Sequence, residues 1–264
     1  IRSGEPAYEC AKEFAAQIAA QDWMVITGAG PGIMEAGHEG AGAAKSFGVN
    51  IVLPFEGAAN DFIANDPKLI NFNYFFTRKV MFMKESHAYV LLPGGFGTMD
   101  ESFELLTLIQ TGKTPPAPVV LLDPPGSTYW DHWHEFVSAE LSDTGLISAD
   151  DMRLVKVAHT VEEAVKEVCG FYRSYHSMRF VGDRLVFRLK RTVGDEELAS
   201  LTEEFAPTIL SGGIERCAAA SAEIQDDDHV DLPRISFNFD RHKWAMLRLL
   251  IDRLNEPPLD NGFV

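Results

Sequence analysis

Six short apolar runs, separated by stretches with helical spacing, constrain the fold of this chain more than any other feature. They are WMVITG at 23–28, VNIVLP at 49–54, LINFNYF at 69–75, AYVLLP at 88–93, PVVLLD at 118–123 and LVKVA at 154–158. Runs that are apolar along their length, without alternation, are typical of parallel strands buried on both faces. Helical spacing at 5–20, 31–46, 77–86, 97–111, 130–141 and 160–170 supplies the connections. The pattern predicts an α/β fold, with a Rossmann-like doubly wound parallel sheet over residues 1–172.

The pattern changes after about residue 171, where polar and apolar residues begin to alternate. RLVFRLK at 184–190 and LPRISFNFD at 232–240 have the alternation of strands with one wet face, and 213–225 is predicted to form a strand or a pair of strands. Helices are predicted at 194–205 and 242–254, and Asp226–Asp228 is predicted to be a solvated turn. The order β-α-β-β-α predicts a small α+β C-terminal domain over 173–264. Dimerisation or packing is its simpler interpretation, and regulatory ligand binding is the alternative.

Composition and charge narrow the classes of partner. The formal net charge is −16, and attraction to a phosphate polymer needs a basic face, so neither nucleic acid nor an anionic membrane is an expected partner. The three cysteines form no Cys-x-x-Cys pair, so neither a zinc knuckle nor a disulfide framework is indicated, and a cytoplasmic location is expected. No apolar run approaches the roughly 18 residues of a membrane span. The chain opens without Met into a helical pattern, and we expect further residues upstream.

Two glycine-rich segments follow apolar runs and open helices. The first is TGAGPGIMEA at 27–36, and the second is PGGFGTMDE at 93–101. Glycines let the backbone approach a ligand closely, and a helix N-terminus offers free N–H donors to an anion. Either segment alone could be a tight turn, and acids early in a helix are stabilised by its dipole in any case. Together, at the carboxyl ends of two strands, they lie where an open α/β sheet binds ligands, and they predict a phosphate cradle.

A third segment places two cations at the head of a predicted helix. Thr77-Arg78-Lys79 stands where positive charge opposes the helix dipole. A solvated first turn is the simpler interpretation. The local electrostatic cost favours an anion nearby, with which Arg78 would pair.

These three segments carry a resemblance to a known family. PGGFGTMDE resembles the PGGxGTxxE signature of the LOG family, once labelled "lysine decarboxylase-like". TGAGPGIMEAGHEGA resembles its TGGGPGIMEAANxGA stretch, and FFTRKVMF resembles the segment that ends in Arg-Lys before the signature strand. The resemblance covers roughly residues 5–170. It implies a phosphoribohydrolase that cleaves the N-glycosidic bond of nucleoside 5′-monophosphates, AMP or cytokinin ribotides among them, to free base and ribose 5-phosphate.

The resemblance also implies roles for individual residues. It assigns catalysis to Arg78 and Glu101, with Glu101 near the ribose and Asp100 diverging from it along the helix. The substrate-binding residues that it implies are Gly28, Gly30, Gly32, Lys79, Pro93, Gly94, Gly95, Gly97, Thr98, Glu104 and Thr107. It further implies a homodimer or higher homo-oligomer, with pocket residues near the subunit interface.

The chain departs from the family pattern at three places. Ala29 replaces a usual Gly, Gly37-His38 replaces the commoner Ala-Asn, and the family's first strand, with its Gly-Ser turn, is absent. That turn normally helps line the pocket, so its absence affects one edge of the predicted site.

Other functions fit the sequence less well. A pyridoxal phosphate enzyme could use Lys79 or Lys84, but no motif for the pyridinium partner is seen. A dinucleotide oxidoreductase needs an acid about 20 residues beyond the first glycine turn, where Val49-Asn50-Ile51 stands. A non-enzymatic nucleotide or molybdenum-cofactor carrier of the same fold is the main alternative, although it would not need both Arg78 and Glu101.

Aromatic and histidine residues near 130 are interpreted as structural. His132 and His134 face different sides of a predicted helix, so they are surface or packing residues, and Trp130 and Trp133 belong to the core. His87 is also structural. No metal and no cofactor are expected.

Overall fold

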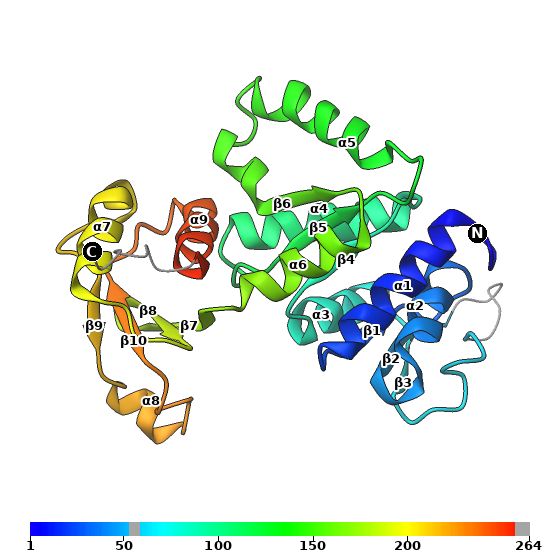
Figure 1. Ribbon diagram of the computed structural model, residues 1–264, viewed down its shortest axis with the longest axis horizontal. Helices are drawn as coiled ribbons and strands as arrows, with labels where there is room; N and C mark the ends of the chain where they lie inside the picture. Colours follow the sequence, from blue (N-terminus) through cyan, green and yellow to red (C-terminus); the bar gives the residue numbers. More distant parts are fainter. Residues whose placement is uncertain (53–58, 257–264) are drawn as a thin grey trace, which may run out of the picture. The chain divides into compact units, whose positions relative to one another are not determined.

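The computed structural model describes residues 1–52 and 59–256 (Figure 1). Its contacts divide the chain into two compact units. The first unit comprises Ile1–Thr107 and Pro118–Val168, and the second comprises Leu108–Ala117 and the chain from Cys169 onward. Each unit is described by itself.

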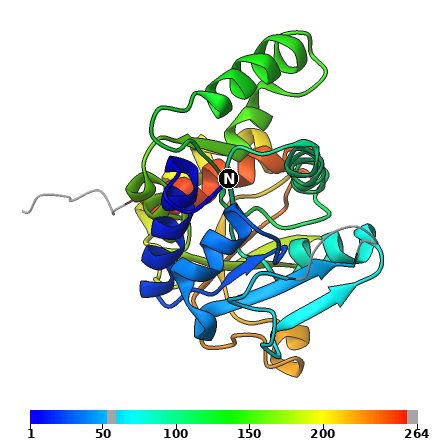
Figure 2. The ribbon, with the colours of Figure 1, turned by 90° about the vertical axis from the view of Figure 1, so that its right-hand side faces the viewer.

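Six parallel strands of the first unit form two three-stranded sheets. One has the order β1-β2-β3 and the other β4-β5-β6. Their bounds are β1 Val25–Thr27, β2 Ser46–Ile51, β3 Leu69–Phe72, β4 Tyr89–Leu91, β5 Val119–Leu122 and β6 Val155–Ala158; β2 and β3 lie side by side in Figure 2. Among the described residues, strand pairing does not join the two sheets. The predicted α/β class with parallel strands is confirmed, and the strands form two sheets. Strands β1 and β4 are each three residues long.

The helices of the first unit occur in the predicted order, with differences at their ends. They are α1 Pro6–Ala20, α2 Ile33–Ala41, α3 Phe75–Glu85, α4 Phe96–Gln110, α5 Tyr129–Val137 and α6 Val161–Phe171. Helix α2 ends earlier than predicted because Gly42 takes a φ of 74°, which a glycine adopts without steric cost. Helix α5 continues as a π-helical turn over Ser138–Ser142. The predicted strand 49–54 begins earlier, at Ser46, and its last residues lie outside the described residues.

Close helix packing and a tryptophan cluster hold the first unit together. A Cβ added at Gly40 of α2 would lie 2.0 Å from the carbonyl oxygen of Lys12 in α1, so only glycine permits this approach. Trp130 and Trp133 of α5 are buried against Leu121 of β5, which confirms their predicted place in the core. Burying such large rings is the main favourable contribution to folding at this position.

The second unit is an antiparallel sheet with helices. Its strand order is β7-β8-β10-β9, with β7 Tyr175–Val181, β8 Arg184–Leu189, β9 Glu215–Cys217 and β10 Arg234–Phe237. The helices are α7 Asp195–Glu204, α8 Ser221–Gln225 and α9 Trp244–Asn255. Two predictions were wrong here. The order is β-β-α-β-α-β-α, because YHSMRFV forms β7 despite a polar pattern, and 213–225 forms one strand and then a helix.

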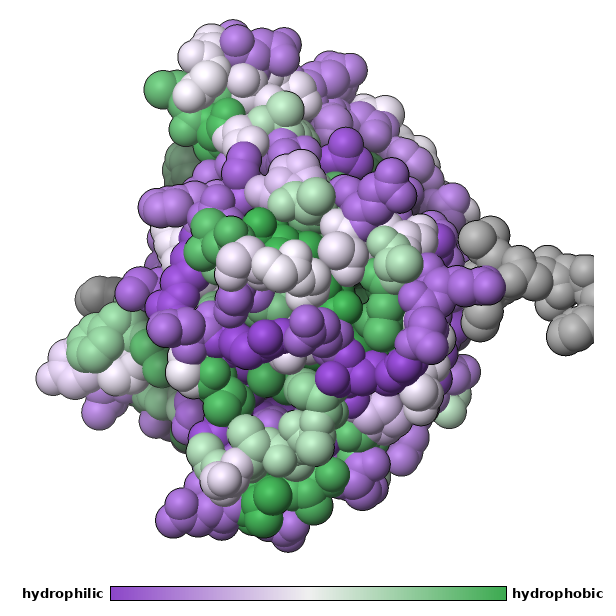
Figure 3. Space-filling view, turned by 90° about the vertical axis from the view of Figure 1, so that its left-hand side faces the viewer, coloured by the Kyte–Doolittle hydropathy of each residue, from purple (hydrophilic) through white to green (hydrophobic). Residues whose placement is uncertain are grey.

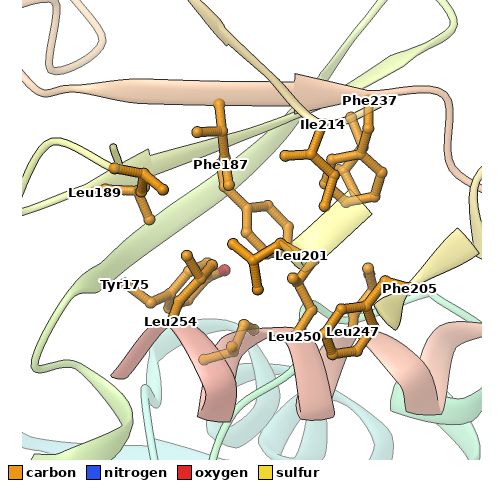
Figure 4. Packing of buried hydrophobic residues seen from close by; sticks show 14 of the residues in the cluster. Tyr175, Phe187, Leu189, Leu201, Phe205, Ile214, Phe237, Leu247, Leu250 and Leu254 are labelled. Atoms are coloured by element: carbon orange, nitrogen blue, oxygen red, sulfur yellow. The ribbon is translucent and has the colours of Figure 1, made fainter. Parts of the chain in front are cut away.

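One face of this sheet carries the apolar core of the second unit. Phe187 and Phe237 from the sheet meet Leu201 of α7 and Leu250 of α9 (Figure 4). Alternation along the strands sends the neighbouring side chains to the other face, where Arg188 is also buried. The second unit therefore has an apolar face and a charged face.

The surface is mixed in character. Hydrophilic and hydrophobic residues are interspersed on the face shown in Figure 3. Across residues 1–52 and 59–256, no helix is long and apolar enough to span a bilayer.

Candidate active site

The turn after β1 and the helix α3 meet at Gly28 and Arg78. A Cβ added at Gly28 would lie 3.6 Å from Nη1 of Arg78 and 2.7 Å from Sδ of Met34. A side chain at position 28 would thus be in ordinary contact with the guanidinium and would crowd the sulfur of Met34. The first glycine segment and the cationic segment, which are far apart in sequence, thus lie together.

Arg78 also pairs with Glu101 of α4. Its Nη2 donates to Oε1 of Glu101 at 2.9 Å, and the two side chains are 13% and 31% exposed. The Arg78 guanidinium also lies over the ring of Phe75, 5.3 Å from the ring centre. Its buried Nε has no acceptor among the described residues, so one donor of Arg78 remains available to a ligand.

Two opposing influences set the acidity of Glu101. Burial raises the pKa of Glu101, Arg78 lowers it, and the net result is a pKa above the ordinary glutamate value. A carboxyl group with a raised pKa beside a cation can exchange protons with a substrate or with water nearer to neutral pH.

Lys79, the other cation of α3, pairs with different acids of α4. Its Nζ contacts Asp100, and it lies 2.9 Å from Oε2 of Glu104. Burial lowers the pKa of Lys79, but the hydrogen bonds to these two acids outweigh it and the pKa is raised, so Lys79 is a cation. Asp100 and Glu101 thus diverge from each other, and each pairs with a separate cation.

The signature loop presents backbone at the start of α4. Gly94, Gly95 and Gly97 are exposed, and α4 begins at Phe96 within the motif. A Cβ at Gly94 would lie 2.1 Å from Oγ1 of Thr98, so glycine lets the Thr98 side chain fold back on the loop. Pro93 is half-buried behind them. The N-terminal N–H groups of a helix have no intrahelical acceptors and suit a bound anion.

The first glycine segment has an unusual backbone. Gly32 has a φ of 74°, and Ala29, at 62°, adopts a positive φ that alanine rarely takes. Gly30 is crowded by Met34, whose methyl carbon would lie 2.4 Å from an added Cβ. Gly30 and Gly32 belong to the same turn as Gly28, the residue that approaches Arg78.

A cavity of about 430 Å³ adjoins these residues. It is lined by Asn73, Tyr74, Phe75, Phe76, Lys79, Asp100 and Glu104. The sequence interpretation missed the aromatic residues among them, although the run NYFF directly before Thr77-Arg78-Lys79 was a usable signal. Thr107, by contrast, lies a turn beyond Glu104 and donates to the carbonyl of Phe103, outside the lining of this cavity.

A larger hollow of about 630 Å³ lies against α5 and β6. His132 and His134, interpreted as surface or packing residues, both line it. Nearby, Asp123, Asp131 and His159 could offer three ligand atoms within 4.8 Å of one another. Both oxygens of Asp123 already accept hydrogen bonds, from Oγ of Ser127 and from N–H of Trp130, so its position is explained by the turn that it holds.

Comparison with known proteins places these features in context. The family model described as "Possible lysine decarboxylase" matches residues 30–168, just over half of the chain. The cytokinin riboside 5′-monophosphate phosphoribohydrolase of Mycobacterium tuberculosis is 31% identical over 160 residues, which cover 60% of this chain and 83% of that protein. A protein of the same name from Arabidopsis thaliana is 30% identical over 114 residues, 43% of this chain and 50% of that one. The chain thus spans about half the length of the plant relative.

Solved structures also resemble the chain. The Moco carrier protein from Chlamydomonas reinhardtii superimposes with a TM-score of 0.41 and 26% identity, over 62% of this chain and 87% of that one. The molybdenum cofactor binding protein from Rippkaea orientalis gives a TM-score of 0.44 and 18% identity, over the same shares of the two chains.

Proposed function

This chain belongs to the LOG family, and from that premise we propose that it hydrolyses the N-glycosidic bond of a nucleoside 5′-monophosphate to free base and ribose 5-phosphate. The observation that carries the proposal is the pair of Arg78 and Glu101, 2.9 Å apart and beside a glycine turn. A protein that only binds a nucleotide has no need of a partly buried carboxylate with a raised pKa at this position.

In the proposed reaction, water attacks C1′ of the ribose and the bond from C1′ to the base nitrogen breaks. Its electron pair leaves with the base, which takes up a proton, and the water oxygen stays on ribose 5-phosphate. Positive charge develops at C1′ and the ring oxygen, where the carboxylate of Glu101 stabilises it and orients the water. Arg78 anchors the substrate or polarises the leaving base through its remaining donor.

The two glycine segments would supply the substrate's orientation. The loop of Gly94–Thr98, whose glycines are exposed, would offer N–H donors to the 5′-phosphate, and the turn with Gly30 and Gly32, which adjoins Arg78 through Gly28, would contact another part of the substrate. Lys79 and Glu104 would contact the remainder of the nucleotide from the wall of the 430 Å³ cavity. Tyr74, Phe75 and Phe76 in the same wall favour an aromatic base, such as the adenine of AMP or of a cytokinin ribotide.

A homodimer is part of the proposal. Helix α3 has no fully buried residue, and Phe75, Phe76 and Val80 on it are exposed, as are Phe96 and Phe103 of α4. Several large exposed apolar residues on two helices favour an interaction surface, and self-association through one patch gives a two-fold dimer. Since these helices carry Arg78 and Glu101, the partner would cover the site's edge.

The catalytic assignment can be tested by separating binding from turnover. Glu101→Gln keeps the size of the side chain and removes its charge, so base release from AMP should fall at least a hundredfold while AMP still binds. Glu39→Gln is the matched control, because Glu39 is also a partly buried, ion-paired carboxylate of the first unit, with Lys12 at 2.6 Å. Near-normal turnover by Glu101→Gln would show that the assignment is wrong.

A further inference from the structure

We propose that Asn60 and Tyr129 are positioning residues, which clamp backbone carbonyls of the two glycine turns so that the opposite N–H groups face the substrate's phosphate. This inference rests on the proposed function for the identity of the ligand. Neither residue belongs to a glycine motif, and each reaches its turn from a separate loop or helix.

Asn60 clamps the first turn through three hydrogen bonds. Its backbone N–H donates to the carbonyl of Ala29 at 2.8 Å, and its side-chain Nδ2 donates to the carbonyls of Ala29 and Gly30, each at 3.0 Å. Asn60 is 9% exposed and Ala29 is fully buried, so water cannot readily replace these bonds. Loss of the amide would leave two carbonyls in a dry environment with reduced hydrogen bonding.

His38 holds Asn60 and the other flank of Ala29. Its Nδ1 lies 3.3 Å from Oδ1 of Asn60, and its Nε2 lies 2.9 Å from Oγ1 of Thr27. The same Thr27 oxygen accepts a hydrogen bond from the N–H of Ala29 at 3.0 Å. Both peptide groups of Ala29 are therefore fixed, which explains how an alanine keeps a positive φ that costs about 1 kcal/mol or more.

Tyr129 clamps the second turn. Its hydroxyl donates to the carbonyl of Gly94 at 2.6 Å. Tyr129 begins α5, and its own N–H donates to Oγ of Ser127, whose hydroxyl donates in turn to the buried Asp123. The clamp is thus anchored to the end of β5, a rigid part of the first unit.

Peptide geometry converts these clamps into donor orientation. In a trans peptide the C=O and the following N–H point in opposite directions within one plane. Holding the carbonyls of Ala29 and Gly94 from behind therefore turns the N–H groups of Gly30 and Gly95 away from the clamps. No residue within 1–52 or 59–256 accepts a hydrogen bond from either N–H. Donors fixed before the ligand arrives bind an anion without the cost of ordering a flexible loop.

The test compares ligands with and without the phosphate. Dissociation constants for AMP, adenosine and inorganic phosphate are measured by calorimetry for the wild-type chain, Tyr129→Phe and Asn60→Ala. We expect Tyr129→Phe, which loses one hydroxyl, to raise the dissociation constant for AMP about fivefold, and Asn60→Ala to raise it about tenfold or more. The dissociation constant for adenosine should be unchanged in both variants. In turnover assays KM for AMP should rise with kcat nearly constant, as expected when uniform binding is lost.

Thr144→Val is the matched control, because the Thr144 hydroxyl also donates to a backbone carbonyl at 2.6 Å but lies outside both turns. It should bind AMP as the wild type does. Wild-type affinity in both clamp variants, or equal weakening of AMP and adenosine, would overturn the inference; if Asn60→Ala does not fold, Tyr129→Phe decides. A wild-type chain that binds AMP without releasing adenine would refute only the proposed hydrolysis.

Discussion

Burial raises the pKa of Glu101, and two nearby cations, Arg78 and Lys79, lower it. Because burial has the larger effect, the Glu101 carboxyl group loses its proton at a higher pH than an ordinary glutamate does. The proposed mechanism needs the carboxylate. Activity should therefore be lost as the pH falls through this raised pKa.

Lys79→Met tests this balance between burial and charge. Removing the positive charge of Lys79 takes away one of the influences that lower the pKa of Glu101, so the pKa rises further. The acid limb of kcat/KM against pH should move to higher pH relative to the wild type. A limb that stays in place or moves to lower pH would contradict the proposed role of Glu101. Absolute rates are not needed, because only the midpoint is compared.

Many residues of the candidate site could be predicted from the sequence, but the residues that hold its glycine turns in place could not. Arg78, Lys79, Glu101 and Glu104 lie together as expected because the motifs fix them on α3 and α4. Asn60 and Tyr129 could not be predicted, since they come from segments without a motif and act on carbonyl groups that every residue has. The aromatic wall at Tyr74–Phe76 was also missed, although its position before Arg78 was visible.

Helix α8 is joined to the second unit's sheet by buried charges. Oε1 of Glu223 accepts from Arg188 at 2.8 Å and from Arg234 at 3.3 Å, and all three side chains are almost fully buried. Asp228 pairs with Arg179 and Arg188, so part of the turn predicted to be solvated is tied to the sheet. The sequence did not predict this helix, because its few residues are held by charge pairs and carry no amphipathic pattern.

Glu223→Gln should destabilise the protein by about 3 kcal/mol or more, because two buried guanidinium groups lose their shared anion. Urea unfolding measures the change. Glu215→Gln is the control, since Glu215 is an exposed partner of Arg184, and it should cost less than about 1 kcal/mol. Equal effects of the two substitutions would contradict the importance of burial.

Acid should act on the same cluster. Burial raises the pKa of Glu223, but hydrogen bonds from Ala220 N–H, Arg188 and Arg234 outweigh it and the net pKa is lowered. A folded pKa below the unfolded value means that the stabilisation is present above the unfolded pKa and is lost as the pH falls through the folded one. Stability measured from pH 7 down to about pH 3 should fall less steeply in Glu223→Gln than in the wild type.

The parallel strands and their helices could be predicted because buried strands have a distinctive apolar pattern. The division into two three-stranded sheets could not, since strand pairing depends on contacts between distant residues. In the second unit, β7 could not be predicted because its sequence is polar and lacks the apolar pattern of a buried strand. Its strand conformation depends on pairing with β8, which lies close only in the folded chain.

The exposed apolar residues of α3 give a prediction about assembly. Val80→Asp should convert the proposed dimer into a monomer, because a carboxylate in an apolar interface is costly to desolvate. Sedimentation equilibrium measures the mass, and Leu146→Asp, at an exposed apolar position between the π-helical turn and β6, should leave it unchanged. A wild-type chain that is monomeric at micromolar concentrations would contradict the dimer.

The proposed hydrolysis is tested by product analysis after incubation with a panel of nucleoside 5′-monophosphates, including AMP and isopentenyladenosine monophosphate, with the matching nucleosides as controls. We expect free base and ribose 5-phosphate to appear from the monophosphates alone, and Glu101→Gln to abolish their release. Tight binding of a monophosphate without release of base from any member of the panel would contradict the proposed hydrolysis, and would favour a carrier of nucleotides or of the molybdenum cofactor.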